Sequence, residues 1–150
     1  MLARSVLLHD GEGGSVRDGQ EETFWGDGTP RSSRGFEIGV PTGTWFSWWP
    51  SGVLRSEQEH PADGSPGRLR FFHPSGELRA EGLAGSGGSR VGVWRFWRPD
   101  GSLEKTGAYR RGQEDGPWEF FDPAGRTIAK GSYEAGARVG VWALDSGEEQ

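Results

Sequence analysis

Short runs rich in Trp and Phe return along the chain at nearly constant intervals, and a polar turn containing glycine follows each of them. The most regular run occupies 92–101, and its pattern is repeated 24 residues later at 116–125. Five copies begin at Gly19, Gly43, Gly67, Gly92 and Gly116, and a sixth begins at Gly140. A fixed period of this size indicates a repeat architecture in which copies stack on their neighbours.

Every copy has the same internal order, which predicts a β-hairpin. An aromatic run leads into a Pro-x-Gly turn such as Pro99-Asp100-Gly101, and a second short run with a Gly-bounded link follows. The proline presets one φ angle and the glycine accepts the reversed one. Two short apolar runs joined by such a turn predict an antiparallel hairpin, and the frequent glycines oppose a helix.

The two-residue period of a strand assigns the aromatic side chains to two faces. One face carries Trp45, Leu69, Trp94, Trp118 and Trp142, with Ser47, Phe71, Phe96, Phe120 and Leu144 two residues on. The opposite face carries Phe24, Trp48, Phe72, Trp97 and Phe121. Large apolar groups are therefore expected on both faces, and the pattern does not decide which face is free.

These patterns predict an all-β fold, an elongated single sheet of tandem antiparallel β-hairpin repeats. Residues 19–144 form five copies and the start of a sixth, and 145–150 form a polar tail. Residues 1–18 are expected to form a lead-in, either a short strand or a loose arm. One hairpin alone is marginally stable, so stacking must bury the rings of adjacent copies.

Composition narrows the class of function. Eight Trp and eight Phe oppose disorder despite 27 Gly. A net charge of −5 disfavours general nucleic-acid binding and unassisted docking on anionic lipid. Zero Cys excludes disulfides and thiolate chemistry. No apolar run approaches the roughly 20 residues of a membrane span, and no signal peptide is evident, so a cytoplasmic location is expected.

The repeating unit Gly-x-Trp-x-Phe-(Phe/Trp)-x-x-x-Gly-x-Leu, with a later Gly-x-Tyr-x-x-Gly, resembles the MORN repeat from about Gly19 to Leu144. It is most similar to the variant in bacterial proteins labelled YwqK-family antitoxins. The resemblance implies an elongated, curved sheet of hairpins without catalytic residues, as in scaffolds, lipid-associated proteins, enzyme appendages and antitoxins. The chain departs from the pattern in its first copy and at 57–64, where His60 takes the Tyr place and an irregular link is expected.

Candidate chemistry is sparse. His73 lies in a turn whose other copies hold Trp49, Arg98 and Asp122, so a structural place is favoured over a metal or catalytic one. The Gly-rich stretches 11–14 and 85–88 lack the strand-to-helix context of a phosphate loop. We therefore expect no catalytic residues, no cofactor and no metal.

The aromatic columns are the strongest functional signal. Their ordinary role is packing between hairpins, but one column could line a binding face, where exposed apolar strips mark interaction sites. The expected partner-binding residues are Trp48, Phe72, Trp97, Phe121, Arg95 and Arg98. Arginines among the rings could bind acidic groups or only keep the sheet solvated. A non-enzymatic module that binds a protein partner, such as a cognate toxin or an effector, is predicted. A carbohydrate- or cell-wall-binding module and a peripheral lipid scaffold are the alternatives, and the oligomeric state is left open.

Overall fold

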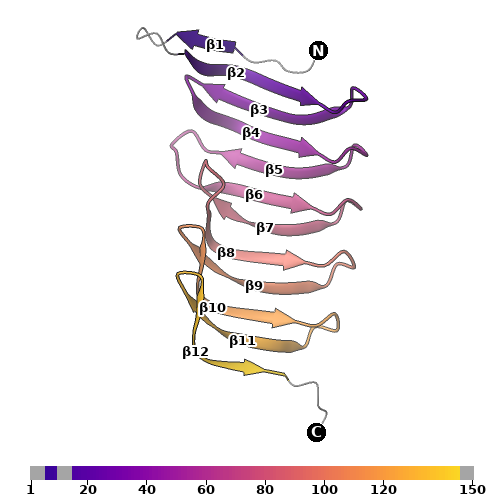
Figure 1. The fold of residues 1–150 in the computed structure, drawn as a ribbon, viewed down its shortest axis with the longest axis vertical. Coiled ribbons are helices and arrows are strands. Elements are labelled where there is room, and N and C mark those ends of the chain that lie inside the picture. Colours follow the sequence, from indigo (N-terminus) through magenta and orange to yellow (C-terminus); the bar gives the residue numbers. More distant parts are fainter. Residues whose placement is uncertain (1–5, 10–14, 146–150) are drawn as a thin grey trace.

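The structure is a computed structural model, and it describes residues 6–9 and 15–145. In this part of the chain there are strands and no helix. All strands join one sheet whose spatial order follows the sequence, with each pair antiparallel (Figure 1). The twelve strands are β1 (Val6–His9), β2 (Ser15–Phe24), β3 (Pro30–Glu37), β4 (Val40–Trp48), β5 (Leu54–His60), β6 (Gly67–Phe72), β7 (Leu78–Ala84), β8 (Arg90–Trp97), β9 (Leu103–Arg110), β10 (Gln113–Phe121), β11 (Thr127–Glu134) and β12 (Ala137–Leu144). The predicted all-β sheet of tandem hairpins is confirmed.

Two kinds of turn alternate along the sheet. The Pro-x-Gly turns close the hairpins on the right side of Figure 1, and the links between hairpins lie on the left. In the turn after β8, Gly101 has a φ of 88° and donates its N–H to the carbonyl of Arg98 at 2.9 Å. In the link after β9, Arg111 and Gly112 both have positive φ, 53° and 81°. Two consecutive positive φ angles define the tight turn that suits the twist of paired strands.

The core lies on one face of the sheet, where tryptophans cover glycines of the adjacent strand. Trp94 and Trp118 lie opposite Gly107 in the strand register, one on each side of it. A Cβ atom built on Gly107 would come within 2.1 Å of the Trp118 ring. The same relation joins Gly82 to Trp94 and Gly131 to Trp142. Glycine is required at these positions because the indole occupies the space of a side chain.

Each buried indole is also held by a hydrogen bond. The Nε1 atom of Trp94 donates to the Leu83 carbonyl at 2.8 Å, and that of Trp118 donates to the Ala108 carbonyl at 3.0 Å. Trp94 is fully buried and Trp118 is 3% exposed. The buried apolar residues are Leu69, Ala80, Ala84, Trp94, Tyr109 and Trp118. We call the face that carries them the core face.

In the first copies the core face is polar. Glu21 stands in the tryptophan place, is 6% exposed, and pairs with Arg34 across β2 and β3 and with Arg17 at 3.3 Å. The Arg34 guanidinium also lies 5.3 Å from the centre of the Trp45 ring. Arg34 lies on an interior strand, β3, and its side chain belongs to the core face.

The predicted lead-in and the predicted polar tail are described only in part. β1 falls within the predicted lead-in, and β2 spans its boundary at residue 18. Most of the predicted polar tail, 146–150, lies outside the described residues, as do 1–5 and 10–14 of the lead-in. The sequence predicts an irregular link at 57–64. Its first part, as far as His60, belongs to strand β5, and residues 61–66 then connect β5 to β6.

Candidate functional site

The predicted aromatic column lies on the face opposite the core, at the ends of strands β4, β6, β8 and β10 beside the hairpin turns. One of its five predicted members, Phe24, stands at the corresponding end of β2, and we call the other four, Trp48, Phe72, Trp97 and Phe121, the turn-side column. Each is half-buried, and its partner across the hairpin is Leu54, Leu78, Leu103 or Thr127 respectively. The rings therefore keep part of their surface on the open face of a single-layer sheet.

A row of charges runs beside this column on the same face. Arg95 is exposed and lies two residues before Trp97, opposite Glu81 in the strand register. Next to it, Arg70 pairs with Glu57 at 3.1 Å and Arg68 reaches Glu81 at 3.8 Å. Acids and bases thus alternate across β5, β6, β7 and β8. Arg95 and Trp97, two residues apart on β8, therefore lie on the same face of the sheet.

Arg98 is placed differently from the other predicted site residues. Its guanidinium donates to the Phe121 carbonyl of the next hairpin. In the equivalent turn positions, the Nε1 atom of Trp49 donates to the Phe72 carbonyl at 3.2 Å, and His73 bonds the Trp97 carbonyl at 2.8 Å. In these three copies the turn residue therefore links successive hairpins, whereas Asp122 accepts hydrogen bonds from Ala124 and Arg126 within its own turn. This structural role for His73 agrees with the prediction. Arg98 is half-buried and lies next to Trp97, at the rim of the turn-side column.

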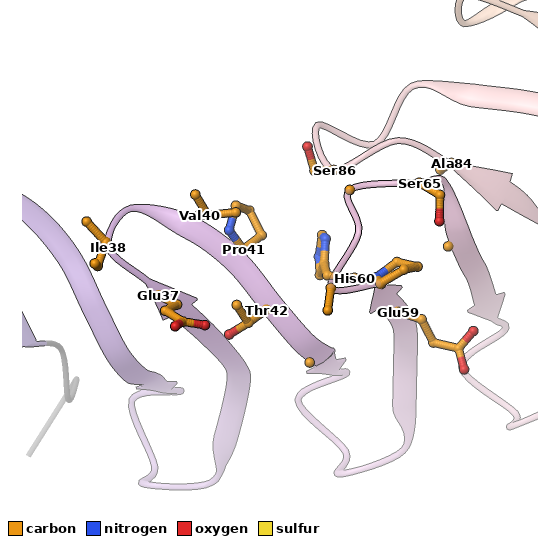
Figure 2. A pocket seen from close by; sticks show the side chains of 15 residues that line it. Glu37, Ile38, Val40, Pro41, Thr42, Glu59, His60, Ser65, Ala84 and Ser86 are labelled. Atoms are coloured by element: carbon orange, nitrogen blue, oxygen red, sulfur yellow. The ribbon is translucent and has the colours of Figure 1, made fainter.

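A second candidate site is a hollow of about 470 Å³ between the β3–β4 turn and the β5–β6 connection. Figure 2 shows Ile38, Val40 and Pro41 on one side of it and His60 and Ser65 on the other, with Glu37 and Glu59 also in its lining. The walls are mainly apolar, and the polar groups come from separate elements. The Ser65 hydroxyl donates to Asp63 at 2.6 Å within the β5–β6 connection.

His60 is the most unusual group of this hollow. It is 8% exposed, its ring centre lies 4.4 Å from that of Trp45, and its Nε2 atom has no hydrogen-bond partner. Burial lowers the pKa of His60 below its usual value of 6.5. The side chain is therefore neutral at physiological pH and fills, as an aromatic ring, the place that Tyr109 and Tyr133 take in later copies.

Sequence reasoning missed the role of Arg90. Its guanidinium lies 4.8 Å from the Trp94 ring centre and 5.3 Å from that of Phe96, and it donates to the Tyr109 hydroxyl at 3.2 Å. The available signal was an arginine four residues before a core-face tryptophan, which recurs as Arg138 before Trp142.

Other classes of site find no support in the described residues. Among them no three His, Asp or Glu side chains gather in a way that could hold a metal ion. Within the same residues no helix could cross a membrane.

Comparison with known proteins identifies one part of the array. Residues 41–60 match the family model described as MORN repeat variant, and these residues form the β4–β5 hairpin. MORN repeats are generally thought to mediate protein or membrane-lipid interactions. No curated protein matches the chain. One hairpin of the sheet, β4–β5, is therefore a MORN repeat variant.

Proposed function

We propose that this protein is a non-enzymatic interaction module that binds a partner protein through the turn-side column. The observation that carries the proposal is the row of half-buried rings on the open face, flanked by the exposed Arg95. Aromatic rings and arginine supply most of the binding energy at protein interfaces when they are buried by a partner. Strong neighbouring charges would fix the register of that partner.

The finer part of the proposal is an antitoxin-like role in a bacterial cytoplasm, with a cognate toxin or an effector as the partner. It is supported by the similarity of the repeating unit to YwqK-type repeats and by the MORN match of β4–β5. The net charge of −5 favours a basic partner over nucleic acid or an anionic membrane. A scaffold role without a toxin is the alternative within the same class.

The test is capture of a partner by the tagged full chain, followed by affinity measurements with two variants. Trp97→Ala removes a ring from the middle of the turn-side column, and Arg95→Glu reverses an exposed charge beside that ring. Each should weaken the complex about tenfold or more, as truncation of a central interface residue does. Val141→Ala is the matched control, because Val141 is apolar, 96% exposed and outside the column.

The proposal fails if the partner binds Trp97→Ala and Arg95→Glu as tightly as the unchanged chain. Two further titrations test the alternatives. Quenching of Trp emission by a cell-wall glycan, abolished in Trp97→Ala, would replace the protein partner by a carbohydrate. Flotation with anionic vesicles at low salt would replace it by a lipid surface.

A further inference from the structure

Two successive copies build the same arrangement of four rings on the core face. In the first arrangement Trp94 is surrounded by Phe71, Phe96 and Tyr109, with ring-centre distances of 6.4, 6.0 and 6.2 Å. In the second, Trp118 is surrounded by Phe96, Phe120 and Tyr133, at 6.3, 6.3 and 6.0 Å. Tyr109 also contacts Trp118 there in an edge arrangement, at 5.2 Å, as a fifth ring. The interplanar angles also agree: 36°, 30° and 80° in the first and 33°, 34° and 81° in the second.

The two arrangements differ in the residue that stands four positions before the tryptophan. In the first it is Arg90, whose guanidinium lies within 4.8–6.0 Å of all four ring centres. In the second it is Glu114, which is half-buried. Among the described residues no Arg or Lys lies over the rings of Trp118, Phe120 or Tyr133, although Arg90 and Lys105 lie over Phe96.

This substitution changes what the second arrangement can bind. The faces of aromatic rings attract a cation electrostatically, most strongly for tryptophan and for a desolvated cation. A carboxylate beside them adds attraction and can form two parallel hydrogen bonds to a guanidinium. Burial raises the pKa of Tyr109, the hydrogen bond from Arg90 lowers it, and the charge of Glu114 adds a smaller raising effect. The Tyr109 ring contacts Trp118, with ring centres 5.2 Å apart, so Glu114 lies beside this arrangement.

We propose that the rings of Phe96, Trp118, Phe120 and Tyr133, together with Glu114, form a binding site for an arginine side chain of the partner protein. The internal precedent is Arg90, which shows that a guanidinium fits this ring geometry. Trp118 is only 3% exposed, so the entering group contacts the half-buried Phe120 and Tyr133 first and pairs with Glu114 at the rim. This inference rests on the proposed function of an interaction module, and it adds a contact on the core face, opposite the turn-side column, for a protein with a protruding basic residue.

The test titrates the full chain with N-acetyl-arginine amide and follows the indole N–H signals by NMR. We expect a saturable shift at the Trp118 indole in the millimolar range and none with N-acetyl-citrulline amide, the neutral analogue. Glu114→Gln should weaken the response several-fold. Glu114→Arg should abolish it, because the new guanidinium would fill the site as Arg90 fills the preceding one.

A gain-of-site variant sharpens the test. Arg90→Glu should create a second responsive site at Trp94, provided that its indole signals remain dispersed as in a folded chain. If this variant does not fold, the Glu114→Arg and Glu114→Gln comparison decides alone.

The inference is overturned by an unresponsive Trp118, by an equal response to citrulline, or by a response that survives Glu114→Arg. A stronger response to N-acetyl-lysine amide overturns the assignment to arginine. None of these titrations uses the partner. The titration can therefore fail while partner capture through Trp97 succeeds, and it can succeed while capture fails, so the two proposals are tested separately.

Discussion

The hairpins β2–β5 and β8–β11 share one backbone period but fill the core face with different chemistry. In β8–β11 the register alternates Trp94, Gly107, Trp118 and Gly131 across the strands. In β2–β5 the same register holds Glu21 and Arg34, and then Trp45 opposite Gln58. Two residues further on, the later hairpins carry Phe96 and Phe120. The equivalent positions in the earlier hairpins are Thr23 and Ser47, which pair with Ser32 and Ser56.

This difference shows that the repeat conserves geometry more strictly than polarity. A partly buried pair of Glu21 and Arg34 replaces an indole and a glycine because each charge has a partner and the guanidinium lies over Trp45. A buried ion pair contributes less net stability than packed rings, since desolvation offsets its attraction. We therefore expect the later hairpins to hold the sheet together and the earlier ones to open first.

The largest effect is expected from Phe96→Ala. The Phe96 ring contacts Trp94, Tyr109 and Trp118, with centres 6.0–6.5 Å apart. Its truncation should lower the free energy of unfolding by about 3–5 kcal/mol. In the earlier hairpins, Ser47→Ala removes only the hydrogen bond to Ser56 and should cost about 1 kcal/mol. Denaturant unfolding measures both, and a loss below about 1 kcal/mol for Phe96→Ala would mean that its face is solvated.

A smaller but diagnostic loss is expected from Gly107→Ala. The added Cβ would overlap the Trp118 ring at 2.1 Å, so either the indole or the strand must move. Overpacking of this kind costs about 2–3 kcal/mol. Gln58→Ala is the matched control at the same register position and should stay within about 1 kcal/mol. Equal effects of the two substitutions would contradict the glycine–tryptophan pairing.

The next effect depends on pH and concerns His60. Its folded-state pKa is lowered by burial, so the unfolded chain takes up the proton more readily. Stability should therefore be full above pH 6.5 and fall as the pH drops below it, by at most about 1.4 kcal/mol per pH unit. His60→Tyr, which restores the ring of later copies, should remove this part of the dependence. Parallel pH profiles of the two proteins would show that His60 is not the group responsible.

The smallest effect is a gain of stability in the β3–β4 turn. Ile38 has a φ of 47°, which a β-branched side chain rarely adopts, and it is 65% exposed. Ile38→Asn should raise the free energy of unfolding by about 0.5–1 kcal/mol, because Asn tolerates this conformation. Ala135→Asn in the β11–β12 turn, at a φ of 50°, serves as the comparison and should change less. A destabilised Ile38→Asn would contradict the expected strain.

The sequence pattern was sufficient to predict the hairpins, their order and the columns on each face. It could not decide which face becomes the core, because both faces hold rings in every full copy. That choice depends on Gly82, Gly107 and Gly131, whose missing side chains admit the indoles of the core face. The recurrence of these glycines in the three later copies, where the earlier copies hold Arg34 and Gln58, was a readable signal. The hydrogen bonds from Trp49, His73 and Arg98 to the next hairpin could not be predicted, because three unlike side chains make the same contact from one repeat position.

Native-state hydrogen exchange tests most directly the claim that the aromatic part of the core face holds the sheet together. Amide protons report the free energy of the local opening that exposes them. The account predicts the slowest exchange in β8, β9 and β10, and progressively faster exchange toward β2 and β3. Equal protection along the sheet, or the slowest exchange in β2–β5, would contradict it.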